Sequence, residues 1–135
     1  MNPVYYDVAF YLDANGFGTL GTDLFGGEWG QVDKQILVLG GAGTPSELKS
    51  LYEMPDIQIL VRGNKSESDR HVYAIAKGVS DLLLSALDNV DINGTCYTGF
   101  EPSSNIAPLG KDENERFIYS MNFTTYRNAF DVAAP

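Results

Sequence analysis

The sequence predicts an α+β fold, in which a small, mostly antiparallel β-sheet carries one main helix packed on it and a short N-terminal helix. Three observations lead to this prediction: a strand-like segment at residues 53–62, a long helical pattern directly after it at residues 66–87, and a second long strand-like segment at residues 115–127. At 135 residues the chain is expected to form a single domain over residues 1–135.

The first expected element is a short amphipathic helix at residues 3–15. Apolar side chains recur there at spacings of three and four, and Pro3 is a residue type tolerated at a helix start. Residues 8–12 would alternatively fit a strand. Asn15-Gly16 ends the element, and residues 19–25 are then expected to form a short extended segment.

The next part of the chain is predicted to be a loop, a strand and an irregular stretch. Residues 26–33 are rich in glycine and acidic residues, which places Trp29, the single tryptophan, on a loop. Residues 35–39 form an apolar run that is typical of a short strand. Residues 44–52 would form either one turn of helix or an irregular segment.

The central strand and the main helix are expected to pack on each other. Alternation in residues 53–62 places Ile57, Ile59 and Val61 on one face of the strand. Cap-type and acidic residues at 66–69 favour the start of a helix that runs to Leu87. Its apolar stripe is predicted to comprise Val72, Ile75, Val79, Leu82 or Leu83, and Ala86, with Lys77, Ser80, Asp81 and Ser85 largely away from it.

The last third of the chain is predicted to be a hairpin, a loop and a long strand. Asn93-Gly94 between two short apolar segments is the signal for a type I′ hairpin. Residues 102–110 are expected to form a loop, and residues 115–127 a strand with an aromatic and a polar face. Residues 131–135 are expected to be a mobile tail.

Charge and cysteine content exclude several classes of protein. The net charge of −9 disfavours a surface that grips nucleic acid, because such affinity comes mainly from Lys and Arg. Cys96 is the single cysteine, so no internal disulfide is possible. We expect a soluble protein made in a cytoplasm, since the sequence shows neither a signal peptide nor a membrane span.

The short motifs of the chain predict no catalytic, cofactor or metal site. Residues 16–21 match G-x-G-x-x-G, but no helix pattern follows them, so we interpret them as a turn. A Cys-His pair would need His71 and Cys96, the single residues of their kinds, to meet in space. Residues 112–115 are acidic but lack the spacing of an EF-hand loop. We therefore predict that the protein is not an enzyme.

The order of segments in the second half of the chain carries a resemblance to a known family. The segments are Ile57–Asn64, the following helix to Leu87, the Ile92–Thr95 hairpin, Leu109–Arg116 and Phe117–Phe123. Together they resemble the tail-terminator and minor-capsid proteins of long-tailed bacteriophages, over residues 6–126.

The resemblance implies a structural role in the virion. Proteins of that family form a six-membered ring on the head-proximal end of the tail tube, where they stop tube growth and provide the surface that joins the head. By this resemblance the partners are other copies of the chain, the tail tube protein and a head-completion or connector protein. DNA would pass through the channel without specific binding, past acidic residues that repel it. No cofactor and no membrane contact are implied.

A ring needs a heterologous interface, which exposed loops of this chain could supply. We expect the contacts in residues 26–29, 103–109 and 112–116, and the candidate interface residues are Trp29, Asp112, Glu113, Asn114 and Arg116. Two alternatives stay open: a head-side connector or minor capsid protein, and a small-molecule-binding or enzymatic α+β domain that uses its glycine-rich loops.

Overall fold

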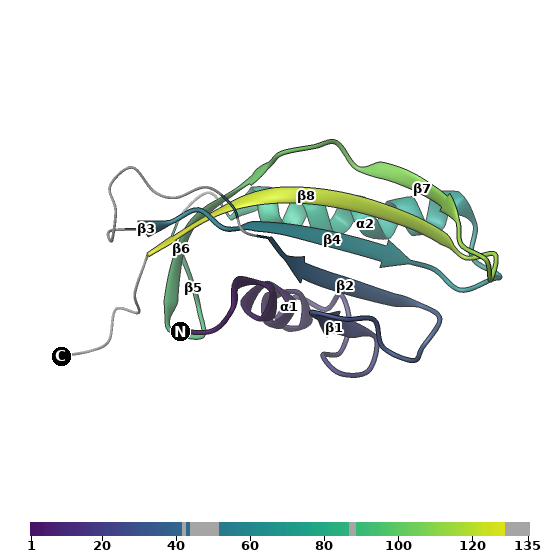
Figure 1. Ribbon diagram of the computed structural model, residues 1–135, viewed down its shortest axis with the longest axis horizontal. Helices are drawn as coiled ribbons and strands as arrows, with labels where there is room; N and C mark the ends of the chain where they lie inside the picture. The colour runs from purple at the N-terminus through teal and green to yellow at the C-terminus, as the bar shows by residue number, and fades with distance from the viewer. Residues whose placement is uncertain (42, 44–51, 87–88, 129–135) are drawn as a thin grey trace.

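The computed structural model describes residues 1–41, 43, 52–86 and 89–128, which contain two helices and eight strands (Figure 1). Their bounds are α1 Val4–Ala14, β1 Leu24–Gly26, β2 Gln35–Gly40, β3 Tyr52–Glu53, β4 Asp56–Arg62, α2 Asp69–Ser85, β5 Val90–Ile92, β6 Thr95–Pro102, β7 Ala107–Lys111 and β8 Phe117–Asn128. The predictions for residues 44–51 and for the tail at 131–135 lie outside the described residues, whereas Tyr52 belongs to β3.

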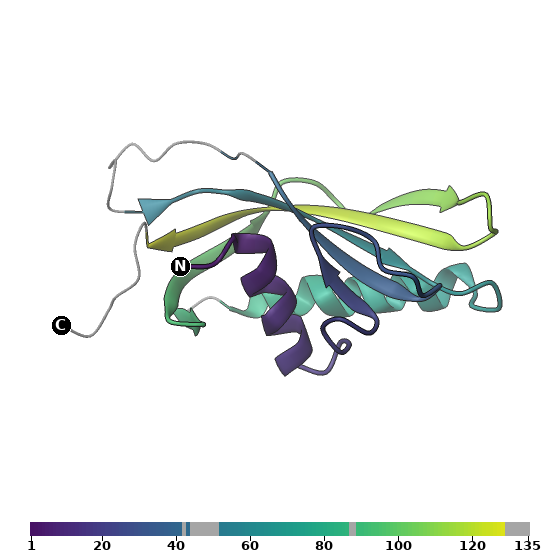
Figure 2. The ribbon, with the colours of Figure 1, turned by 60° about the horizontal axis from the view of Figure 1, so that its bottom comes forward.

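The strands form one curled sheet in the order β1-β2-β4-β8-β6-β5 (Figures 1 and 2). The long strand β8 also pairs with β3 near its C-terminal end and with β7 near its start. The predicted α+β fold is confirmed. The sheet is mixed rather than purely antiparallel, because β1 runs parallel to β2 while the other strand pairs are antiparallel.

The apolar face of the sheet forms the core together with both helices. Ile57, Ile59 and Val61 of β4 are at most 1% exposed, as the alternation predicted, and Met121 and Phe123 of β8 lie beside them in register. The same cluster of buried side chains includes residues of α1 and α2. Burial of this face is the main stabilising contribution to the fold.

The N-terminal segment is a helix, which decides between the two predicted alternatives. Val4, Val8 and Leu12 of α1 are buried against the β1–β2 side of the sheet. Asp7 is also fully buried, and its carboxylate accepts hydrogen bonds from the hydroxyl of Tyr97 at 2.6 Å and from the amide of Asn93 at 3.0 Å. These bonds connect α1 to the β5–β6 hairpin.

Helix α2 begins three residues later than predicted. The backbone N–H and the hydroxyl of Ser66 both donate to the side-chain oxygen of Asn64, which forms a turn before the helix. The hydroxyl of Ser68 then caps α2 by accepting from the backbone N–H of His71 at 3.2 Å. Leu87 lies outside the described residues.

The buried stripe of α2 differs from the predicted stripe at three positions, since Ile75 is only half-buried while Ala76 and Ser80 are buried. Val72, Val79 and Leu83 are buried as expected, but Ser80 is also buried, at 7% exposure. Ser80 lies four residues after the buried Ala76 and therefore on the same helix face. Small side chains at both positions allow α2 to pack closely on β8.

The predicted hairpin is confirmed, and the loop prediction for residues 102–110 is partly wrong. Asn93 and Gly94 both have positive φ, at 53° and 84°, as a type I′ turn requires. Residues 107–110 belong to β7, in which Pro108 opposes Tyr119 of β8. Proline and a register shift are tolerated here because no described strand lies on the outer side of β7.

Two further boundaries differ from the predictions. Strand β8 begins at Phe117 because Glu115 has a φ of 60° and belongs to a turn. The extended segment predicted at residues 19–25 is reduced to β1, since the carboxylate of Asp23 accepts a hydrogen bond from the backbone N–H of Thr19 at 2.7 Å and holds a turn there.

Candidate functional site

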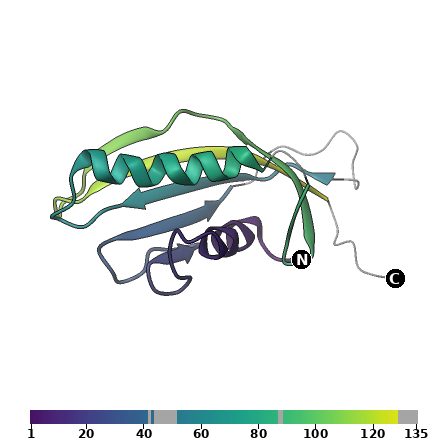
Figure 3. The same cartoon turned by 180° about the vertical axis from the view of Figure 1, so that it is seen from behind.

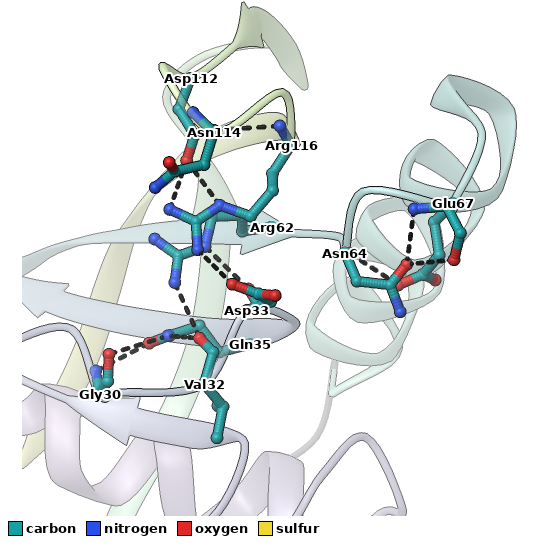
Figure 4. Close-up of polar contacts among 11 residues, drawn as sticks. Gly30, Val32, Asp33, Gln35, Arg62, Asn64, Glu67, Asp112, Asn114 and Arg116 are labelled. Atoms are coloured by element: carbon teal, nitrogen blue, oxygen red, sulfur yellow. Dashed lines mark hydrogen bonds and ion pairs between the residues drawn. The ribbon is translucent and has the colours of Figure 1, made fainter.

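Five charged and aromatic side chains meet at the end of the sheet where β4 ends and the β7–β8 turn lies. We call this group the two-arginine cluster, and it consists of Trp29, Asp33, Arg62, Asp112 and Arg116. The close-up in Figure 4 shows how the side chains of Asp33, Arg62 and Arg116 converge. Three chain segments that are far apart in the sequence thus build one surface.

Arg62 fastens the β1–β2 loop to the end of β4. Its Cζ atom lies 4.3 Å from the centre of the Trp29 ring, a distance suited to a cation–π interaction. Its Nε and Nη2 atoms donate to the backbone carbonyls of Asp33 at 2.8 Å and Val32 at 2.9 Å. Burial, and then the nearby charge of Arg116, lower the pKa of Arg62. The guanidinium is therefore held by the loop that it supports.

Gln35, the first residue of β2, also fixes the β1–β2 loop through its side chain. The side-chain oxygen of the buried Gln35 accepts from the backbone N–H of Gly30 at 2.9 Å, and its amide nitrogen donates to the carbonyls of Gly30 and Val32 (Figure 4). The loop has no regular secondary structure, so its backbone groups need other hydrogen-bond partners, and the amide of Gln35 supplies them. Trp29 is consequently presented from a well-defined position.

Arg116 joins the β7–β8 turn to the β1–β2 loop. Its Nε and Nη2 atoms both bind Oδ2 of Asp112, at 2.9 and 2.7 Å, and its Nη1 binds Oδ1 of Asp33 at 2.8 Å. Oδ1 of Asp112 also accepts from the backbone N–H groups of Asn114 and Arg116 at 3.0 Å each. The hydrogen bond from Arg116 lowers the pKa of Asp112, so the carboxylate stays charged well into the acidic range.

The most exposed side chains of the cluster are those of Trp29 and Asp33. Trp29 is 37% exposed and the side chain of Asp33 is 62% exposed, whereas the side chains of Arg116 and Asp112 are only 12% and 18% exposed. A partner would therefore meet Trp29 and Asp33 first, with the two arginines behind them.

The structure brings together most of the candidate residues that the sequence suggested. Trp29, Asp112 and Arg116 belong to the cluster, and Asn114 contributes its backbone N–H to it. Glu113 is exposed in the same turn. Residues 103–109 do not contribute to the contacts of the cluster given above. Sequence reasoning missed Asp33 and Arg62, because no local pattern links positions so far apart.

A pocket of about 230 Å³ lies next to the cluster. Its walls are mainly apolar, and its polar groups come from Asp23, Lys34, Gln35 and Arg62. Gly16 also lines it, but residues 16–21 follow a helix and precede β1, so the strand-then-helix order of a dinucleotide-binding motif is not present there. The interpretation of these glycines as a turn agrees with the positive φ of Gly16 and Gly21.

The remaining candidates for chemistry lie apart from one another. His71 is exposed and pairs with Glu67 at 2.8 Å, and Cys96 is half-buried in β6. Within the described ranges, no group of three His, Cys, Asp or Glu side chains is placed to hold a metal ion. Neither described helix is long and apolar enough to cross a membrane.

The fold and the cluster define a small α+β protein with a fixed, partly exposed polar and aromatic surface. A family model described as bacteriophage tail terminator protein matches residues 11–128, which include the whole two-arginine cluster. The chain therefore belongs to the bacteriophage tail terminator family, as the resemblance implied, and is a structural protein of the phage tail and hence of the virion. No curated protein matches the chain.

Proposed function

We propose that the protein caps the head-proximal end of a phage tail tube as a ring, stops the polymerisation of the tube and provides the surface that joins the head. The family match over residues 11–128 is the observation that carries this proposal. The ring is proposed to contain six copies, and the further partners are the tail tube protein and a head-completion or connector protein.

The two-arginine cluster supports a role in these contacts. Trp and Arg are the residue types that most often dominate binding energy at protein interfaces. Here the Trp29 side chain is held by Arg62 and the loop behind it by Gln35, so little conformational entropy is lost when a partner covers it. We assign Trp29 and Asp33 to direct contact with a partner, and Arg62, Asp112 and Arg116 to the positioning of that surface.

The charge of the chain supports passage of DNA through the ring. With a net charge of −9 per copy, a lumen lined by acidic side chains would repel the phosphate backbone and prevent the DNA from sticking. A map of the assembled ring with a basic lumen would contradict this part of the proposal.

Electron microscopy of lysates tests the proposed function. The gene is disrupted in the parent phage, and tail length and head attachment are compared with the intact phage and with the disrupted phage supplied with the gene in trans. Headless tubes longer than normal are the expected result. Detached tails of normal length would instead assign the protein to a head-side connector, and normal particles would contradict a structural role at the neck.

A further inference from the structure

The chain contains two Asn-Gly pairs, Asn15-Gly16 and Asn93-Gly94, a combination that is prone to spontaneous deamidation. Glycine has no side chain to shield its main-chain nitrogen, so this nitrogen can attack the side-chain amide carbon of the preceding asparagine. A carbon–nitrogen bond forms between them, and the amide nitrogen leaves as ammonia together with the proton of the glycine N–H. Water then opens the resulting succinimide ring at either carbonyl. The asparagine thus becomes aspartate or isoaspartate, and a neutral amide is replaced by a carboxylate.

The two asparagines differ in what their amides hold. Nδ2 of Asn93 donates to Oδ1 of Asp7 at 3.0 Å, and Asp7 is a fully buried residue of α1. Nδ2 of Asn15 donates to the carbonyl of Tyr11, one turn earlier in the chain, at 2.8 Å and at an exposed site. Figure 3 shows the β5–β6 hairpin reaching the N-terminal end of α1. The Asn93 amide therefore joins two distant segments, whereas the Asn15 amide bonds at the end of its own helix.

The Asn93-Gly94 turn is open to water, and hydrogen bonds hold both of its reacting groups. Asn93 and Gly94 are exposed, and no atom outside the neighbouring residues lies within 4 Å of the position that a Cβ on Gly94 would take. The N–H of Gly94 donates to Oδ1 of Asp91 at 2.9 Å, while the amide of Asn93 is held by Asp7. The attack requires that these groups move towards each other, so the reaction proceeds when the hairpin opens locally.

A carboxylate at position 93 would face the carboxylate of Asp7. Oδ1 of Asp7 would lose a donor, and two like charges at hydrogen-bond distance repel each other strongly beside a buried site. Nη1 of Arg127 lies 4.0 Å from Oδ2 of Asp7, but Arg127 already binds Glu53 at 2.9 Å and is engaged there. Isoaspartate would also lengthen the main chain within the two-residue turn that sets the pairing of β5 with β6.

We propose that Asn93 is a deamidation site whose conversion breaks the polar attachment of α1 to the β5–β6 hairpin. The reaction consumes only water, and it is irreversible because ammonia is lost to the solvent. Asn15 undergoes the same chemistry at the exposed end of α1, with little effect on the fold. The inference does not rest on the proposed function, since it concerns the folded chain apart from any partner.

Peptide mapping by mass spectrometry tests the reaction at each Asn-Gly pair separately. The purified full chain is incubated at mildly alkaline pH as folded wild type, as folded Asp91→Ala and unfolded in urea, and the exchange of amide for acid is followed by mass. We expect Asn93 to react fastest in urea, more slowly in Asp91→Ala and slowest in the wild type, because Asp91 holds the Gly94 N–H. Asn15 should react equally in the two folded proteins. Equal rates at Asn93 in the two folded proteins, or no conversion there in either, would overturn the proposal.

The structural consequence is tested with Asn93→Asp, which reproduces one product without incubation. We expect its melting temperature to fall by about 5 °C or more, whereas the matched control Asn15→Asp should lower it by about 2 °C or less. Asp7→Asn removes the opposing charge, so Asn93→Asp should lower the melting temperature less than half as much in that background. Equal effects in both backgrounds, or at both asparagines, would overturn the proposal.

A variant that fails to fold still gives a decision. If Asn93→Asp alone does not fold, the expected result is that Asn93→Asp combined with Asp7→Asn folds, because the repulsion between the two carboxylates is then removed. A double variant that also fails to fold would contradict the assignment of the loss to Asp7. The melting temperature of wild-type protein converted at residue 93, separated from unconverted protein by its added charge, checks the same point without any substitution, and a value equal to that of unconverted protein would overturn the proposal.

Discussion

Single residues in this protein act mainly by holding the exposed loops in place. Arg116 binds two carboxylates from different segments, Asp112 in its own turn and Asp33 in the β1–β2 loop. Planar guanidinium groups suit this role, because they offer several donors in a fixed geometry. A lysine at either arginine position would keep the charge but lose this fixed set of hydrogen bonds.

The contact between Arg116 and Asp112 should make the free energy of unfolding depend on pH in the acid range. The pKa of Asp112 lies below its ordinary value of 3.8 in the folded protein, so the unfolded chain binds the proton more readily. This contribution to stability is thus complete above about pH 5, where Asp112 is ionised in both states, and is lost as the pH falls through the lowered pKa. We expect Arg116→Gln to return the pKa of Asp112 towards 3.8 and to cost at most about 1 kcal/mol at neutral pH.

An NMR titration of the Asp112 carboxyl carbon measures this pKa directly. Arg116→Lys is the matched control, and we expect it to restore part of the shift because it retains the charge. An Asp112 pKa that is the same in the wild type and in Arg116→Gln would contradict the assignment of the shift to this contact.

Trp29 should matter more for assembly than for folding. Trp29→Ala removes a side chain that is 37% exposed and one cation–π contact with Arg62, so we expect it to change the free energy of unfolding by about 1 kcal/mol or less. If Trp29 is an interface anchor, the yield of complete particles should fall by roughly tenfold or more in a complementation assay. Val32→Ala, at 39% exposure in the same loop, is the control and should have a smaller effect.

At the scale of elements, helix α1 is held to the rest of the fold by a buried polar group as well as by apolar packing. Asp7 accepts hydrogen bonds from Tyr97 and Asn93, and the Nη1 atom of Arg127 lies 4.0 Å from Oδ2 of Asp7. Burial and the hydrogen bond to Asp7 raise the pKa of Tyr97, so its hydroxyl remains a donor at neutral pH. The N-terminal helix, the hairpin and β8 are joined at this point.

Asp7→Ala should therefore destabilise the protein strongly. The substitution leaves the buried hydroxyl of Tyr97 and the amide of Asn93 without their acceptor, whereas Arg127 keeps its ion pair with Glu53 at 2.9 Å. We expect a loss of about 3 kcal/mol in the free energy of unfolding. Asp7→Asn keeps a side-chain oxygen that can accept a hydrogen bond, and it should therefore lower the free energy of unfolding by less than Asp7→Ala does. Urea denaturation followed by circular dichroism measures both, and equal stabilities of wild type and Asp7→Ala would show that the polar group contributes nothing.

The start of α2 offers a test with two serines only two positions apart. Ser68→Ala removes the helix cap and should cost about 1 kcal/mol. Ser66→Ala removes only a hydrogen bond to Asn64 in the preceding turn and should cost less than about 0.5 kcal/mol. Thermal unfolding of both variants measures their stabilities. An equal loss of stability at the two positions would contradict the assignment of Ser68 as the cap of α2.

The elements predicted well are those with a strong local pattern. Alternation in β4 and β8, the helical spacing in α2 and the Asn93-Gly94 turn all act over a few residues. Strand β7 was missed because Pro108 and Gly110 signal a loop, and only its position at an edge of the sheet explains why both are tolerated. The two-arginine cluster depends on contacts between Trp29, Arg62 and Arg116 that the fold alone creates, so only part of it could be predicted.

At the scale of the whole molecule, the exposed apolar and aromatic side chains fall on distinct surfaces. Trp29 and Val32 belong to the loop of the two-arginine cluster, Tyr6 and Phe10 to α1, and Tyr73 to α2. The proposed ring would need several such surfaces on each copy, because each copy would contact two neighbours and the structures above and below the ring. The distribution therefore fits a protein whose function lies in its contacts with other proteins.

The edge position of β7 has a consequence for the time before assembly. A long, flat edge strand is a template for backbone pairing between copies, which leads to fibres and aggregates. In β7, Pro108 has no N–H to offer, Gly110 accompanies a register shift, and Lys111 adds a charge. Free copies of the chain would thus resist edge-to-edge pairing through β7 before they assemble with other proteins.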